Sequence, residues 1–161
     1  MHRSTKDIRR EAEQLLKAAG VTGAPVVLRD VVSYLNLSLV ERAREPFSSE
    51  AALVPLGEGH AIELRGTSNA RRRRFTIAHE IGHFLLHPER AVTERGGATN
   101  ATMAALEREA NQFAAELLMP EHLVRQAVLE EGADARRACV RAGVGCGLRL
   151  SIACGKYSIG V

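Results

Sequence analysis

The sequence predicts an α+β fold in which helices pack on a small three-stranded antiparallel sheet. Several stretches repeat apolar residues with the 3.6-residue period of a helix, and three short stretches alternate apolar and polar residues as half-buried strands do. The length of 161 residues suits one domain with a substantial core, and the charged fraction of 25% is ordinary for a soluble globular protein.

Composition excludes several classes of protein. No apolar run has the length of a membrane span, and residues 1–6 lead into a polar helix instead of a signal-peptide core, so we expect a cytoplasmic protein without membrane association. The net charge of +3 is mild and is concentrated in the four arginines at 71–74, so direct binding to nucleic acid is not expected. Three cysteines without a C-x-x-C pair argue against a disulfide framework or a cysteine-based metal site.

The first 36 residues predict two helices. Ser4 and Asp7 have the spacing of a capping box that opens the first helix, and Gly20 is expected to end it. The apolar face of this helix comprises Ile8, Ala12, Leu15, Leu16 and Ala19. A second, short helix is expected at about residues 28–36, where apolar residues suit plain core packing.

Three stretches then predict strands. Residues 37–42 and 60–65 alternate apolar and polar side chains, and residues 51–56 have the composition of another strand. The turn residues 57–59 separate the second strand from the third. We expect the three strands to form one antiparallel sheet.

The next predicted helix contains His79-Glu80-Ile81-Gly82-His83. Residues four apart on a helix share a face and lie about 6 Å apart along its axis, so His79 and His83 can reach one metal ion. This H-E-x-x-H pattern is the signature of zinc hydrolases, in which the two imidazoles hold Zn²⁺ and Glu80 would be the general base toward the attacking water. The alternative is an ordinary amphipathic helix, but the surroundings are mostly apolar, and buried imidazoles and carboxylates need partners.

The ends of this helix carry further candidates. Ser68 or Asn69 can cap its start and Pro88 ends it, and the arginines at 71–74 suit a solvated face or a contact with an acidic partner or DNA. His87 extends the histidine series, but eight helical residues rise about 12 Å, whereas zinc-bound nitrogens lie about 2.0–2.1 Å from the ion. His87 is therefore expected to be a helix-end histidine favoured by the dipole and not a ligand.

A third protein ligand is expected from a helix at about residues 103–119. Its apolar stripe comprises Leu106, Ala110, Phe113 and Leu117. Glu109 lies within this stripe, and a core-facing carboxylate is costly unless it is paired or bound to metal, so Glu109 is the preferred donor. Glu107 and Arg108 point away from the stripe and are expected to be solvated. Glu116 lies at the border of the stripe and stays an alternative donor.

Residues 74–83 (RFTIAHEIGH) together with residues 109–120 (EANQFAAELLMP) closely resemble the ImmA/IrrE family of zinc metallopeptidases. The resemblance runs from the first helix to about Leu129 and implies a minimal zincin-like, gluzincin-type fold built around the H-E-x-x-H helix. It implies His79, His83 and Glu109 as ligands of Zn²⁺, with Mn²⁺ as an alternative ion, and Glu80 as the catalytic glutamate. Characterised members cleave helix-turn-helix repressors of the Xre type, which implies such a repressor as the protein substrate and release of stress-response or mobile-element genes as the outcome.

The sequence thus predicts one metallopeptidase domain at residues 1–141, followed by an atypical tail at 142–161 whose Gly- and Cys-rich sequence departs from the family. A substrate segment is expected to lie extended beside the sheet, along residues 61–65. Two alternatives stay open. One is a non-catalytic binding or sensing module with a structural zinc site, and the other is a DNA-binding regulator that uses the arginines at 71–74.

Overall fold

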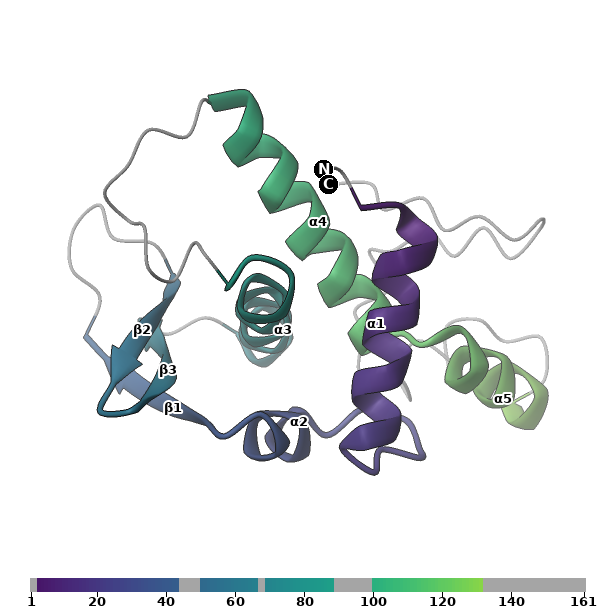
Figure 1. The fold of residues 1–161 in the computed structure, drawn as a ribbon. Coiled ribbons are helices and arrows are strands. Elements are labelled where there is room, and N and C mark those ends of the chain that lie inside the picture. Colours follow the sequence, from purple (N-terminus) through teal and green to yellow (C-terminus); the bar gives the residue numbers. More distant parts are fainter. Residues whose placement is uncertain (1–2, 44–49, 67–68, 89–99, 132–161) are drawn as a thin grey trace.

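We describe the chain from a computed structural model that covers residues 3–43, 50–66, 69–88 and 100–131. Within these ranges the elements are α1 (Thr5–Ala18), α2 (Leu28–Tyr34), β1 (Leu37–Arg42), β2 (Ala51–Leu56), β3 (Gly59–Arg65), α3 (Ala70–Leu86), α4 (Asn100–Leu118) and α5 (Glu121–Glu131). The α+β class is confirmed (Figure 1). The predicted tail and the domain boundary at residue 141 lie outside the described ranges.

Local signals set the ends of the helices. The Ser4 Oγ accepts the Asp7 N–H at 3.2 Å, and Gly20, with φ of 71°, ends α1 as expected. Helix α2 ends two residues earlier than predicted because Asn36 adopts a left-handed φ of 53°. Of the two candidate caps of α3, the structure uses Asn69, whose Oδ1 accepts the Arg72 N–H at 2.9 Å.

The sheet has the strand order β1-β3-β2, and it is mixed. Strand β2 pairs antiparallel with β3, but β1 pairs parallel with β3, so the prediction of a fully antiparallel sheet was wrong. Side-chain alternation shows which residues form strands, but it does not show the order of the strands. Because β3 lies in the middle, two reversals of chain direction bring it parallel to β1.

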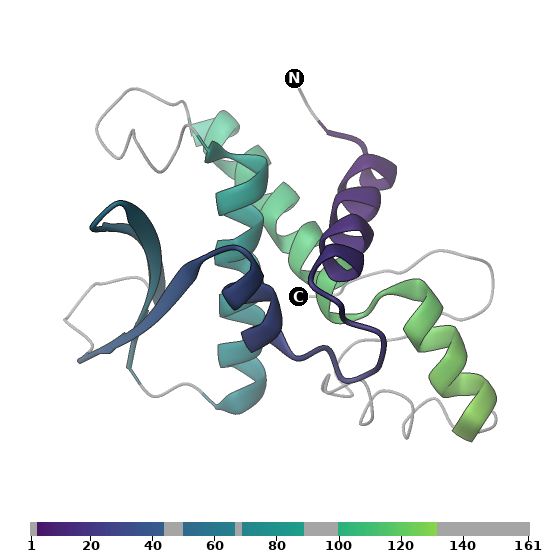
Figure 2. The same ribbon diagram turned by 60° about the horizontal axis from the view of Figure 1, so that its bottom comes forward.

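Helix α3 lies between the sheet and α4, and α1 covers the other side of α4 (Figures 1 and 2). The core between these layers contains several side chains that are fully buried. They are Leu16, Val26, Val31, Ile62, Ile81, Phe113 and Leu117. Within the described ranges, every helix is too short or too polar to serve as a membrane span.

Helices α3 and α4 approach each other most closely at Gly82. A Cβ atom placed on Gly82 would lie 3.2 Å from the Cα and carbonyl oxygen of Ala110 and from Cδ1 of Phe113. The missing side chain therefore allows the backbone of α4 to lie against α3 one residue before His83. This contact fixes which residues of the two helices face each other.

Candidate metal centre

Three potential metal ligands meet where α3 and α4 face each other. The Nε2 atoms of His79 and His83 lie 3.0 Å apart. The Glu107 carboxylate, from α4, places Oε2 3.2 Å from Nε2 of His79 and Oε1 3.4 Å from Nε2 of His83. Ligand atoms about 2.0–2.2 Å from a tetrahedral zinc lie roughly 3.3–3.6 Å from one another. The donor set therefore fits one metal ion to within a few tenths of an ångström.

Asn111 orients one of the two imidazoles. Its Oδ1 lies 3.0 Å from Nδ1 of His79, and because an amide oxygen only accepts, Nδ1 carries the proton and Nε2 keeps its lone pair toward Glu107. Metal-binding histidines commonly have such a partner on the second ring nitrogen. Glu107 and Asn111 lie four residues apart, one helical turn, so a single face of α4 supplies both the carboxylate and the orienting amide.

The cluster opens to solvent on one side. The side chains of His83 and His79 are 9% and 17% exposed, whereas that of Glu107 is 40% exposed. A ligand set that is buried on the α3 side and open on the α4 side leaves room for a water molecule and a substrate beside the ion.

Glu109 does not join this cluster. It is 5% exposed, accepts a hydrogen bond from the backbone N–H of Arg3 at 3.1 Å, and lies with Oε2 4.0 Å from Nε2 of His87. The sequence favoured Glu109 as the third donor, whereas among the described residues the structure groups Glu107 with His79 and His83. The apolar stripe of α4 correctly indicated that Glu109 is buried. A partner that offsets the cost of this burial is Arg3, which lies 106 residues away in the sequence.

The remaining histidine of the helix lies at the C-terminal end of α3, as predicted. His87 follows the last residue of α3, is buried, and places Nε2 3.2 Å from the carbonyl oxygen of Leu106. It is absent from the group of donors formed by His79, His83 and Glu107 in the described part of the chain. Glu80 is half-buried and lies next to His79 on α3.

Three of the four arginines at 71–74 contact other parts of the protein. Arg72 pairs with Glu50 at 2.6 Å, Arg73 pairs with Glu41, and Nη2 of Arg74 donates to the Val26 carbonyl at 2.9 Å. Burial lowers the pKa of the Arg74 guanidinium below its ordinary value. The prediction of a solvated face thus describes only part of this run, which contacts β1, the residue before β2 and the segment before α2.

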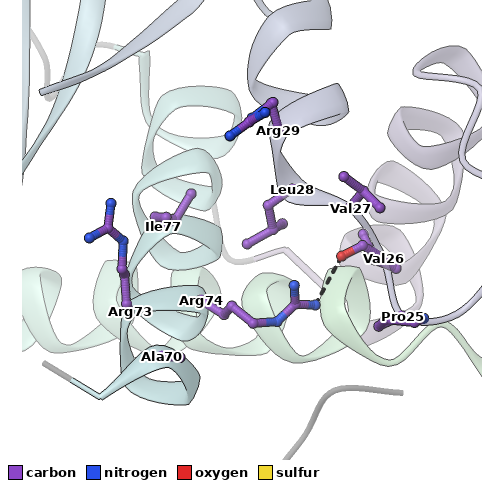
Figure 3. A pocket seen from close by; sticks show the side chains of 9 residues that line it. All are labelled: Pro25, Val26, Val27, Leu28, Arg29, Ala70, Arg73, Arg74 and Ile77. Atoms are coloured by element: carbon purple, nitrogen blue, oxygen red, sulfur yellow. Dashed lines mark hydrogen bonds between the residues drawn. The ribbon is translucent and has the colours of Figure 1, made fainter. Parts of the chain in front are cut away.

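Arg73 and Arg74 also line a surface pocket of about 430 Å³ between the start of α2 and α3 (Figure 3). Its lining comprises Pro25, Val26, Val27, Leu28, Arg29, Ala70, Arg73, Arg74 and Ile77. Ile77 and His79 are two residues apart on α3, about 200° around the helix axis, so this pocket lies on the opposite face of α3 from the metal donors.

Sequence reasoning missed Glu107 and Asn111 as site residues. The signal that could have identified them is their spacing, because a carboxylate followed four residues later by an amide supplies a ligand and its orienting group from one helical face. The apolar stripe, by contrast, reports burial, and burial alone does not distinguish a metal ligand from an ion-paired carboxylate.

Comparisons with known proteins show which family the chain resembles. Residues 31–148 match the family described as Peptidase_M78, IrrE N-terminal-like domain. Over 65 residues, which are 40% of this chain and 41% of the relative, the sequence is 37% identical to uncharacterized immunity region protein 2 of Bacillus phage phi105.

A solved structure shares the fold. It is that of a Mycobacterium tuberculosis transcriptional regulator, with a TM-score of 0.61 and 20% identity over 86% of this chain and 52% of that one. The chain thus spans about half, or less, of the length of each of these two relatives. Since the family match covers most of the chain and includes both metal-site helices, the chain belongs to the IrrE N-terminal-like domain family.

Proposed function

We propose that this protein is a metal-dependent peptidase whose ion, Zn²⁺ with Mn²⁺ as the alternative, is held by His79, His83 and Glu107. The observation that carries the proposal is the set of donor separations of 3.0–3.4 Å between two imidazole nitrogens and a carboxylate. Glu107 replaces Glu109 as the third ligand. Two histidines and one carboxylate with an open fourth position form a typical catalytic zinc site.

A bound zinc ion would polarise the scissile carbonyl and lower the pKa of water. Glu80 takes a proton from the attacking water and delivers it to the nitrogen of the leaving amine. Asn111 holds His79 in the tautomer with the proton on Nδ1, so the lone pair of Nε2 is available to a metal ion. Each of these groups lies on α3 or α4, whose close contact at Gly82 makes the arrangement rigid.

The substrate segment would pair with β2 and not, as expected from the sequence, with the strand at residues 61–65. Strand β3 is paired on both sides, whereas β2 ends the described sheet. The Glu50 carbonyl accepts the Arg65 N–H at 2.8 Å, so alternate residues from Glu50 onward direct their backbone groups toward β3 and Leu53 directs its own outward. An extended loop of a protein substrate could exchange main-chain hydrogen bonds with Leu53.

We further propose that the substrate is a helix-turn-helix repressor in the cytoplasm and that the cut relieves repression of stress-response or mobile-element genes. Membership of the IrrE N-terminal-like domain family supports this substrate class. The phage relative is itself described as an immunity region protein, which is consistent with a role beside a repressor.

The test uses the purified full chain, Zn²⁺, and a helix-turn-helix repressor chosen from the genes next to its own. Wild type should cut the repressor at one site, and Glu80→Gln should bind zinc equally well but cut on the order of 10²–10⁴-fold more slowly, because general-base catalysis contributes about that factor. Cleavage by Glu80→Gln at the wild-type rate would refute the mechanism. Zinc binding by a wild-type protein that never cuts would instead favour the sensing module with a structural zinc site.

A further inference from the structure

The buried Glu109 and His87 and the more exposed Arg3 form a polar cluster that the proposed mechanism does not use. We propose that these three residues, the interhelix tether, are positioning residues that hold Glu107 at the distance needed for metal binding. The inference rests on the metal site proposed above. It assigns a role to the carboxylate that sequence reasoning had placed on the metal.

The first part of the tether connects α4 to the end of α3 through Arg3. The backbone N–H of Arg3 donates to Oε1 of Glu109 at 3.1 Å, and Nη1 lies 3.8 Å from Oε2. The same Nη1 donates to the carbonyl of Leu86 at 2.6 Å. Leu86 is the last residue of α3, and carbonyls in the last turn of a helix have no partner within the helix. Arg3 therefore satisfies a helix-end carbonyl and a buried carboxylate at once.

The second part of the tether is His87. Its Nε2 lies 3.2 Å from the Leu106 carbonyl and 4.0 Å from Oε2 of Glu109. Because a carbonyl only accepts, Nε2 carries a proton and donates it to Leu106. His87 is 7% exposed, so this hydrogen bond is shielded from water and links the residue after α3 directly to the backbone of α4.

These contacts flank the proposed ligand. Leu106 immediately precedes Glu107, and Glu109 follows it by two residues, so both attachments to α3 lie within one turn of Glu107 on α4. On α3 the attachments begin three residues after His83. The tether thus fixes the separation of the two backbone segments that supply the ligands. This separation matters because metal–ligand distances tolerate deviations of only about 0.2 Å.

Two features show that the tether is more than surface pairing. Glu109 is 5% exposed, so its carboxylate needs its partners, and the Gly82 contact with Ala110 lies next to it on the same helix. The contact at Gly82 limits how closely α3 and α4 approach, while the tether prevents their ends from separating. Together they restrain the position of α4 from both directions.

The test measures metal binding in the full chain and does not require catalysis. Zn²⁺ affinity by competition with a chelator, the visible spectrum of the Co²⁺-loaded protein, and the denaturation midpoint of the metal-free protein are compared for wild type, Arg3→Ala, Glu109→Gln and Glu107→Gln. Arg10→Ala is the matched control, because Arg10 pairs with Asp7 on the exposed face of α1.

Arg3→Ala and Glu109→Gln should each lose on the order of 10–100-fold in Zn²⁺ affinity, the usual effect of removing groups that support metal ligands. Their Co²⁺ spectra should shift toward that of Glu107→Gln, and Arg3→Lys should recover part of the affinity. Unchanged affinity and an unchanged Co²⁺ spectrum, with only a lower denaturation midpoint, would overturn the tether. Absence of Zn²⁺ binding by wild type would instead overturn the metal site itself. Should Arg3→Ala not fold, Glu109→Gln, which keeps the shape of the side chain, decides the question.

Discussion

Replacing Gly82 by alanine tests how the packing of α3 on α4 controls the metal site. The added Cβ would lie 3.2 Å from three atoms, and two of these belong to the backbone of Ala110 and cannot rotate away. Carbon atoms in good contact lie about 3.5–4.0 Å apart, so α4 must move away from α3 by roughly 0.3 Å or more. That shift exceeds the tolerance of about 0.2 Å for metal-ligand distances.

The expected effects on stability and on metal binding differ in size. Overpacking a core costs about 1–3 kcal/mol, and alanine in a helix regains up to about 1 kcal/mol over glycine, so the metal-free protein should lose about 1 kcal/mol of unfolding free energy. The Zn²⁺ affinity should fall on the order of tenfold, because Glu107 moves together with Ala110 on α4.

Chemical denaturation of the metal-free protein and chelator competition for Zn²⁺ measure the two effects separately. Gly82→Ser, with a larger side chain, should reduce both quantities further than Gly82→Ala does. A Gly82→Ala protein that is more stable than wild type and binds Zn²⁺ with unchanged affinity would refute the reasoning, because it would show that the two helices have room for a side chain at this position.

Two further predictions concern individual hydrogen bonds. Asn111→Ala should reduce Zn²⁺ affinity on the order of 10–100-fold, whereas Asn111→Asp, which can still accept from Nδ1 of His79, should retain most of it in the same chelator competition. The hydrogen bond from Ser4 lowers the pKa of Asp7 below its ordinary value of 3.8, so this carboxylate contributes stability that is present above that pH and is lost as the pH falls below it. When the pH is lowered from 5, the unfolding free energy of Asp7→Asn should therefore fall less than that of wild type, as measured by denaturant titration. An equal fall in both proteins would contradict the stabilising role of the Asp7 carboxylate.

The sequence by itself determined the features that depend on residues close together in the chain. The Ser4–Asp7 cap, the end of α1 at Gly20 and the position of His87 at the end of α3 were all predicted from local signals and are found in the structure. His79 and His83 converge because four residues make about one helical turn, a property of the helix that needs no tertiary contact. The same argument excluded His87, since two helical turns separate it from His79.

Only the tertiary structure decided which carboxylate meets the histidines and how the strands are ordered. Glu107 and Glu109 have the same chemistry, and their roles differ because Arg3, 106 residues from Glu109, pairs with one of them while α3 faces the other. Periodicity records which side chains are buried, but it carries no information about the partner that lies opposite. The parallel pairing of β1 with β3 was likewise not predictable, because alternation within a strand does not show which strands become neighbours.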